Sequence, residues 1–241
     1  MLRVTILRAL SDNYVFLLRG AAAAEAAVVD PGEAAPVVHY LEGEDLRLAA
    51  IVNTHHHGDH TGGNRELLKR SPGIPVYGGA LDRGRIPGQT QFLAENDTVD
   101  VCGARARVLE VPGHTRAHVA YFFDPGDGGG DVFSGDTLFG GTIGNLFEGT
   151  PETMFESVRK IRALPRGTRI WCSHEYTLEF VREAAQVDPH NARLAERLKR
   201  LQAAAPAGGA TVPLTLEEEC ATNPFLRWDD AALAAHIGRP P

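Results

Sequence analysis

The sequence predicts an α/β fold followed by a C-terminal helical region, and three observations support this fold class. Strand-like and helix-like segments alternate along the chain as far as Tyr176. Several of the strand-like segments end in histidine or aspartate side chains. Beyond Tyr176 only helix-like periodicity follows. We therefore expect two domains, a larger α/β domain of residues 1–176 and a smaller helical domain of residues 177–241.

Strand signals dominate the first two thirds of the chain. Helices are expected near residues 33–41 and 64–70, and residues 81–91 are expected to form a loop. Residues 21–27 are rich in alanine, but a glycine precedes them and a proline-glycine turn follows, so we expect a hairpin that leads into a strand. The expected strands cover residues 4–7, 14–18, 48–52, 76–78, 98–101, 106–111, 119–123, 131–134 and 169–172.

Capping residues predict where the later helices begin. Thr150 and Asp188 are each followed by proline, the residue that best tolerates the first helical position, so each is expected to start a helix. Thr215 with a glutamate three residues later predicts a short helix. Asp229 or Asp230 is expected to cap a last one.

Composition and charge exclude several classes of function. The net charge of −7 gives no general attraction for nucleic acid or for anionic membranes. The first eight residues lack the apolar core of a signal peptide, and no later segment approaches the roughly 20 apolar residues of a membrane span. Cys102, Cys172 and Cys220 are widely spaced, which favours free thiols in a reducing compartment. We expect a cytoplasmic monomer with no nucleic-acid partner and no membrane partner.

Residues 54–63, Thr-His-His-His-Gly-Asp-His-Thr-Gly-Gly, concentrate metal-binding side chains directly after a predicted strand. Because alternate residues of an extended segment face the same side, His55 and His57 can bind one cation. Asp59 and His60 then turn toward a second cation. Imidazole nitrogens and carboxylate oxygens suit zinc, iron or manganese.

Three further candidate ligands, His114, Asp136 and His174, each follow a strand of their own. They complete two sets of three to four ligands if Asp136 bridges the two cations. One histidine after a strand is most often an ordinary polar residue, but seven ligand-type residues at strand ends argue against chance. His56 is expected to face away, and His118 is expected to form a hydrogen bond beside the ligands rather than bind metal.

Several motifs resemble one protein family. Residues 54–63 are similar to the signature of the metallo-β-lactamase-fold hydrolases. Five other runs resemble, more narrowly, glyoxalase II, the hydroxyacylglutathione hydrolases. These runs are Pro112-Gly113-His114-Thr115, Ser134-Gly135-Asp136-Thr137-Leu138-Phe139, Phe147-Glu148-Gly149-Thr150, His174-Glu175-Tyr176-Thr177 and Asn223-Pro224-Phe225-Leu226-Arg227. The Phe-Glu-Gly-Thr and His-Glu-Tyr-Thr runs are much more specific than the first motif.

The resemblance implies an αββα sandwich, the metallo-β-lactamase fold, with a C-terminal helical substrate-binding domain. It also implies two divalent metal ions, zinc in the first instance, with iron or manganese as alternatives. Asp59 and Asp136 are the expected catalytic residues. The implied ligands are His55, His57 and His114 for the first ion, Asp59, His60 and His174 for the second, and Asp136 between them.

The implied reaction is hydrolysis of a small-molecule thioester, a glutathione conjugate such as S-D-lactoylglutathione. Two cations roughly 3.5–4 Å apart can share a water molecule and lower its pKa from about 15.7 toward about 7, so hydroxide forms near neutral pH. The oxyanion of the attacked carbonyl is stabilised by a cation. The leaving thiol has a pKa of about 8.5, so it departs as a thiolate without a strong general acid.

The substrate contacts match the family less closely than the metal ligands do. Tyr176 matches the family tyrosine that contacts glutathione, whereas Asn145 stands at a position that is basic in the family and Phe147 stands where tyrosine is frequent. Arg227 and Arg239 are the cationic candidates near the C-terminal end of the chain. Losing one charge-assisted hydrogen bond costs about 1.5–3 kcal/mol, so we expect weak binding of glutathione thioesters or a preference for a related thioester.

Three alternatives stay open at this point. Persulfide dioxygenases share the fold and the first histidine site but use one iron ion and oxygen. The Asp136-Thr137-Leu138-Phe139 run and the His174-Glu175-Tyr176 run favour the hydrolases instead. A metallo-hydrolase for another thioester, a lactone or a β-lactam is a second alternative. A non-catalytic metal-binding role is the third, and the complete ligand set argues against it.

Overall fold

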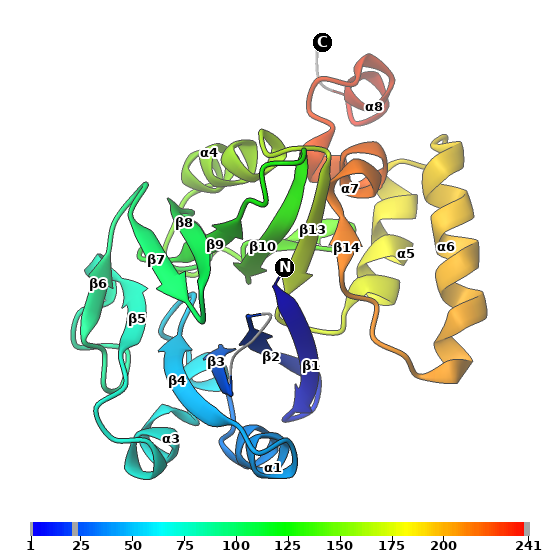
Figure 1. The fold of residues 1–241 in the computed structure, drawn as a ribbon. Coiled ribbons are helices and arrows are strands. Elements are labelled where there is room, and N and C mark those ends of the chain that lie inside the picture. Colours follow the sequence, from blue (N-terminus) through cyan, green and yellow to red (C-terminus); the bar gives the residue numbers. More distant parts are fainter. Residues whose placement is uncertain (1, 21–23, 239–241) are drawn as a thin grey trace.

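The computed structural model describes residues 2–20 and 24–238, which form two six-stranded sheets with helices outside them (Figure 1). The first sheet has the order β1 (Arg3–Ala9), β2 (Asn13–Arg19), β3 (Glu25–Val29), β4 (Arg47–Val52), β5 (Val76–Gly79) and β6 (Gln91–Leu93). The second sheet has the order β14 (Leu214–Thr215), β13 (Gly167–Cys172), β10 (Gly129–Gly135), β9 (Val119–Phe123), β8 (Ala104–Glu110) and β7 (Thr98–Val101). A separate hairpin pairs β11 (Leu138–Phe139) with β12 (Thr142–Ile143).

The helices lie on the outer faces of the sheets. Figure 1 shows α1 and α3 beside the first sheet, with α5 and α6 next to each other beyond β14. The α-helices are α1 (Ala35–Gly43), α2 (Gly58–Thr61), α3 (Asn64–Arg70), α4 (Pro151–Arg162), α5 (Thr177–Val187), α6 (Ala192–Ala204), α7 (Leu216–Thr222) and α8 (Ala231–His236). Three short 3-10 helices are η1 (Ala80–Asp82), η2 (Ala205–Ala207) and η3 (Pro224–Leu226). None of the described helices is long and apolar enough to cross a membrane.

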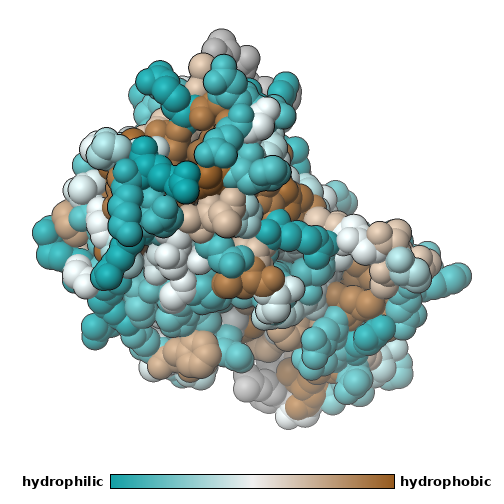
Figure 2. All heavy atoms as spheres, turned by 90° about the horizontal axis from the view of Figure 1, so that it is seen from below, coloured by the Kyte–Doolittle hydropathy of each residue, from teal (hydrophilic) through white to brown (hydrophobic). Residues whose placement is uncertain are grey.

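Strand β2 shows how the sequence builds these layers. Its residues are apolar on both sides, so both faces of the strand are buried. The ring of Phe16 faces the second sheet, where it packs edge-on against Phe133 at 5.4 Å and Trp171 at 5.6 Å. Val15 and Leu17 face the other way into a separate core beneath the outer helices. Figure 2 views the molecule from the side of α1 and α3, where hydrophilic residues cover most of the surface.

The predicted fold class is confirmed, but β14, β6 and the β11–β12 hairpin were not predicted. The prediction that only helices follow Tyr176 is wrong, because β14 pairs antiparallel with β13. The division of the chain at residue 176 stays a prediction. Strand β6 and the β11–β12 hairpin were not predicted, because each strand has only two or three residues and shows no periodicity. Residues 21–23 lie outside the described residues, and β3 follows them as expected.

The capping predictions are mostly confirmed. The side chains of Thr150, Thr215 and Asp230 each accept a hydrogen bond from a backbone N–H in the first turn of their helix. The prediction for Asp188 is wrong, because α6 begins after Asn191, whose side chain caps it instead. The Asp188 carboxylate accepts hydrogen bonds from other side chains, so it is not free to cap a helix.

Candidate metal centre

The seven ligands predicted from the sequence lie together in the structure. They follow β4, β8, β10 and β13, or lie on the short helix α2, so ends of strands from both sheets supply them. Their donor atoms form three overlapping groups, and within each group these atoms lie within 4.8 Å of one another. The groups are His55, His57 and His114; His55, His60 and Asp136; and Asp59, His60 and His174.

Asp136 lies between the two sets of histidines. Its Oδ2 atom is 3.4 Å from Nε2 of His114 and 3.5 Å from Nε2 of His174. Its Oδ1 atom is 3.5 Å from Nε2 of His60. On the first side, Nδ1 of His57 lies 3.1 Å from His114 Nε2. The carboxylate is therefore within reach of both groups, as a bridging ligand must be.

Hydrogen bonds on the outer side of the rings orient the histidines toward the centre. Nδ1 of His114 donates to the backbone oxygen of Asn145 at 2.9 Å, and Nδ1 of His174 donates to Asp12 Oδ1 at 2.7 Å. Because a carbonyl or carboxylate oxygen only accepts, each Nδ1 carries the hydrogen. In the neutral ring Nε2 then presents a lone pair to the centre, as metal binding requires.

Asp30, in the turn after β3, orients the ring of His60 in the same way. Its carboxylate accepts hydrogen bonds from the backbone and hydroxyl of Thr54, at 2.8 and 2.7 Å, and lies 3.1 Å from His60 Nδ1. On the inner side, His60 Nε2 and Asp136 Oδ1 are buried and have no hydrogen-bond partner in the described part of the chain. Unpaired buried polar atoms are rare and costly, so these two atoms fit a bound cation.

The electrostatics of the cluster favour a positive charge at its centre. Burial acts to raise the pKa of Asp136, but the charge of His60 and the close contact of the His174 imidazole hold it well below its ordinary value. Burial acts to lower the pKa of His174, yet Asp136, Asp59 and Asp12 raise it to about 10. The carboxylates thus remain ionised and attract either protons or metal cations.

His118 was predicted to form a hydrogen bond beside the ligands, and it does. Its Nε2 atom accepts from the backbone N–H of Asp136 at 3.1 Å, and its ring stacks on that of His55 at 4.6 Å. Gly135 makes this contact possible, because its φ angle is +50° and a Cβ atom there would lie 2.5 Å from Thr54 Oγ1. His118 and Gly135 together fix the position of Asp136.

His56 points away from the centre, as predicted, toward a second cluster of charged groups. Its ring lies between Asp82, at 3.2 Å, and the guanidinium of Arg85. Arg85 also forms a two-pronged ion pair with Glu148, which additionally accepts from the backbone N–H of Arg116 at 3.0 Å. This ion pair connects the segment after η1 to the loop that follows β12.

Sequence analysis missed three polar residues that support the ligands. Asp12 and Asp30 bind the outer nitrogens of His174 and His60, and the Asn13 amide donates to Asp59 Oδ2 at 3.1 Å. Asp12 and Asp30 lie in the turns after β1 and β3, and Asn13 is the first residue of β2. Their position beside strand ends was the available signal, but isolated polar residues in turns are too common to stand out.

A cleft of about 590 Å³ opens beside the cluster. Of the predicted substrate contacts, Asn145, Phe147 and Tyr176 line it. The prediction for Arg227 is not supported by its position, because its guanidinium pairs with two aspartates and it does not line the cleft. Arg239 lies outside the described residues. The cleft-lining residues that were not predicted include Phe139, Thr142, Ile143, Phe180 and Glu183.

The fold and the site define the class of protein. Residues 10–174 match the family model described as the metallo-beta-lactamase superfamily. Among solved structures, the BLEG-1 B3 metallo-beta-lactamase is 24% identical with a TM-score of 0.68, covering 94% of this chain and 99% of that one, a likeness of fold alone. TTHA1623, solved in a di-iron-bound form, is 27% identical with a TM-score of 0.62, covering 93% of this chain and all of the other. The chain is a member of this superfamily, and its clustered histidines and aspartates support a site for two divalent metal ions.

Relatives with higher sequence identity show which family of the superfamily the chain belongs to. Residues 175–241 match the family model described as the hydroxyacylglutathione hydrolase C-terminus. The hydroxyacylglutathione hydrolase of Synechocystis sp. is 53% identical, over 96% of this chain and 91% of the relative. The enzyme of the same name from Microcystis aeruginosa is 54% identical, over 95% of this chain and 90% of the relative. The chain belongs to the hydroxyacylglutathione hydrolase family.

Proposed function

We propose that this enzyme, a thioester hydrolase, cleaves S-(2-hydroxyacyl)glutathione to the hydroxy acid and glutathione, with S-D-lactoylglutathione as its substrate. The observation that carries the proposal is the convergence of seven histidine and aspartate donors, from ends of strands in both sheets, on one side of a cleft. The cleft gives the thioester access to the site, and the donors are of the type that binds hydrolytic metals.

The proposed ligand sets are those expected from the sequence. His55, His57 and His114 would hold one ion, Asp59, His60 and His174 would hold the other, and Asp136 would be shared by both. Zinc is the proposed metal, because a mixed imidazole and carboxylate set suits it. Two such ions supply Lewis acidity that lowers the pKa of water from about 15.7 toward about 7.

The protein's own groups set the charge and the geometry for the reaction. Burial acts to raise the pKa of Asp59, but the nearby imidazoles of His174 and His60 and the hydrogen bond from Asn13 hold it well below its ordinary value. Asp59 and Asp136 are therefore ionised at neutral pH and balance the positive charge of the site. Hydroxide adds to the thioester carbonyl carbon, the carbon–sulfur bond breaks, and the electron pair leaves with sulfur as a thiolate, whose pKa of about 8.5 makes a strong general acid unnecessary.

The cleft supports the expectation of weak glutathione binding. Its described lining includes no lysine or arginine, and it carries the carboxylate of Glu183 on α5. Asn145 is exposed at the position where the family has a basic residue. A carboxylate of the substrate therefore finds no lysine or arginine among these lining residues, and we expect a higher Michaelis constant than glutathione-selective enzymes have.

Steady-state kinetics on a panel of thioesters, with free-thiol detection and metal quantification, tests the proposal. Release of glutathione from S-D-lactoylglutathione with two metal ions per chain is the expected result. Hydrolysis of other thioesters or lactones alone would favour the alternative of a metallo-hydrolase for one of those substrates. One iron ion per chain with oxygen uptake would instead identify the dioxygenase alternative.

We also propose a cytoplasmic monomer that acts on a small molecule without nucleic-acid or membrane partners. The three cysteines are free thiols in the structure, which supports a reducing compartment. Sedimentation of the purified protein and fractionation of its host cells test the two parts of this proposal separately.

A further inference from the structure

The β11–β12 hairpin forms one wall of the cleft but has little structure of its own. Phe139, Thr142 and Ile143 from this hairpin line the cleft. The hairpin begins two residues after Asp136 and pairs over only two residues on each side. A hairpin this short is not stable alone. Its position must therefore be fixed by neighbouring parts of the chain.

Asn223, at the end of α7, holds both strands of the hairpin. Its side chain is fully buried, and its amide nitrogen donates to the backbone oxygens of Phe139 at 3.3 Å and Thr142 at 3.1 Å. Its side-chain oxygen accepts from the backbone N–H of Phe225 at 3.0 Å. This is the asparagine of the Asn-Pro-Phe run, and no structural role was predicted for this residue.

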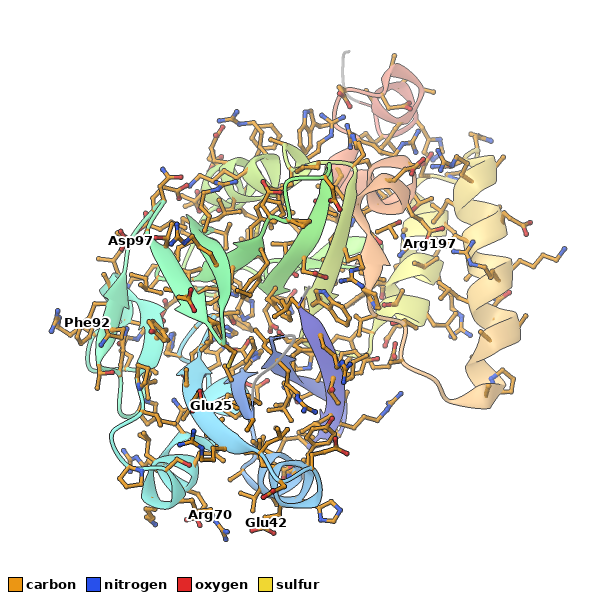
Figure 3. All side chains as sticks on the ribbon, in the orientation of Figure 1. Glu25, Glu42, Arg70, Phe92, Asp97 and Arg197 are labelled. Atoms are coloured by element: carbon orange, nitrogen blue, oxygen red, sulfur yellow. The ribbon has the colours of Figure 1, made fainter. Side chains whose placement is uncertain are left out.

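A buried ion pair completes the connection between the helices and the hairpin. Glu219 accepts from the backbone N–H of Gly141 at 2.9 Å and from Asn223 at 3.1 Å. Its other oxygen pairs with Arg197 on α6, which also donates to Thr222 Oγ1 at 2.7 Å. Arg197 lies on the side of α6 that faces α5 and α7 (Figure 3). The two charged side chains are 1% and 0% exposed, so each depends on the other for its charge balance.

The turn of the hairpin fits closely against the same helices. A Cβ atom at Gly140 would lie 2.6 Å from the Thr177 side chain on α5. Gly141 has a φ angle of +85°, and a Cβ atom there would lie 3.0 Å from the side chain of Val181. Glycine is required at the first position by space and at the second by backbone conformation as well. The helices thus fix this wall by packing as well as by hydrogen bonds.

We infer that Arg197, Glu219 and Asn223 are positioning residues that set the substrate affinity of the cleft. None of the three lines the cleft or belongs to the candidate metal groups, so they act through the hairpin. Loss of the connection lets the wall move and weakens the fit of the substrate. The inference rests on the proposed function insofar as the ligand of the cleft is a glutathione thioester.

The Asn223→Ala variant removes the contact to both strands and keeps the Arg197–Glu219 pair. We expect KM for S-D-lactoylglutathione to rise about five- to tenfold, as one or two lost hydrogen bonds imply, with kcat within about twofold. Metal content stays unchanged. A non-hydrolysable glutathione thioether, measured by calorimetry, loses affinity by the same factor. A purely structural role would instead reduce the active fraction and kcat and leave KM unchanged.

A second variant and a control complete the test. Glu219→Gln keeps an oxygen for Arg197 but turns amide hydrogens toward the donors of Gly141 and Asn223, so the same rise in KM is expected. Arg200→Ala breaks the exposed 2.6 Å ion pair with Glu218, also between α6 and α7, and should leave KM unchanged. If one variant does not fold, the other decides.

The outcomes separate the inference from the proposed function. Wild-type KM and thioether affinity in the folded Asn223 or Glu219 variant would overturn the inference alone. A wild-type protein that binds the thioether but hydrolyses no thioester overturns the proposed function, and the calorimetric comparison then decides the inference. A wild-type protein that neither binds the thioether nor hydrolyses a thioester overturns both the proposed function and the inference.

Discussion

The metal cluster and the outer wall of the cleft are built in different ways. Each ligand of the cluster follows directly from a strand or lies on one short helix, and hydrogen bonds from nearby turns hold the rings in place. The outer wall consists of the β11–β12 hairpin, the loop after it and residues of α5, and side chains from α6 and α7 support it. Four of the candidate ligands therefore lie in one short segment and the other three each follow a strand of their own, whereas the wall depends on contacts between a short hairpin and distant helices.

Because the two regions are built differently, substitutions in them should have different effects. Changes in the cluster should abolish metal binding and turnover together. Changes in the wall should alter KM or stability and leave the metal in place.

The largest effect is expected at Asp136. Asp136→Asn removes the charge that both groups of histidines share, so we expect metal content to fall and kcat/KM to drop by at least about 1000-fold. Elemental analysis and steady-state kinetics measure the two effects. Asp131→Asn, on the strand that precedes Asp136 but hydrogen-bonded to Trp171 and Arg169, is the matched control and should keep its metal and activity. An Asp136 variant that retains both metals and full turnover would contradict the proposed bridge.

The next effect is expected at Asp12, outside the ligand set. Asp12→Ala leaves Nδ1 of His174 and the hydroxyl of Tyr176 without their acceptor, so the ring is less firmly held. Residues of this kind typically contribute 10–100-fold to metal affinity or activity, on the order of 1.4–2.7 kcal/mol. Competition with a chromophoric chelator measures the affinity. Asp127→Ala, in the exposed turn before β10, is the control, and equal affinities in the two variants would show that the contact does not matter.

The clustering of the seven candidate ligands was predictable because its signal in the sequence is dense. The run of residues 54–63 places four candidate donors in one segment, and each of the other three follows an apolar strand. Asp12, Asn13 and Asp30 were not predictable, because a single polar residue beside or at a strand end does not show which distant side chain it contacts. The pairing of β14 with β13 was hidden for a related reason, since two residues carry no pattern.

Arg227 was predicted to contact the substrate, but its ion pairs favour a structural role. The family motif made it a candidate, but its guanidinium pairs with Asp188, whose side chain is 8% exposed, and with Asp230. Arg227→Met should destabilise the protein by about 1–3 kcal/mol, because Asp188 loses its charge partner. Urea unfolding measures this loss, and KM should stay within about twofold of the wild type. A tenfold rise in KM would return Arg227 to the substrate contacts.

A substitution at Asn145 tests directly how the charge of the cleft wall affects KM. Its backbone oxygen accepts from His114, so the side chain can change without removing that hydrogen bond. Asn145→Lys adds a cation at the cleft, and we expect KM for a glutathione thioester to fall about tenfold with little change in kcat. The gain should shrink at high ionic strength, since salt screens exposed charges. Asn145→Gln, which adds length without charge, should show no gain.

The smallest effect is expected at the ion pair between Arg85 and Glu148, which ties the loop after β12 to the segment after η1. The hydrogen bond from Arg85 lowers the pKa of Glu148 from 4.5 to about 2. A depressed folded pKa stabilises the protein fully above pH 4.5, and this stabilisation is lost as the pH falls from 4.5 toward 2. Glu148→Gln should therefore cost up to roughly 1 kcal/mol at pH 7 and progressively less below pH 4.5. Urea unfolding with a chelator present, so that metal loss does not contribute, measures both values. An equal cost at pH 7 and pH 3 would show that the charge of Glu148 contributes nothing to holding this side of the cleft.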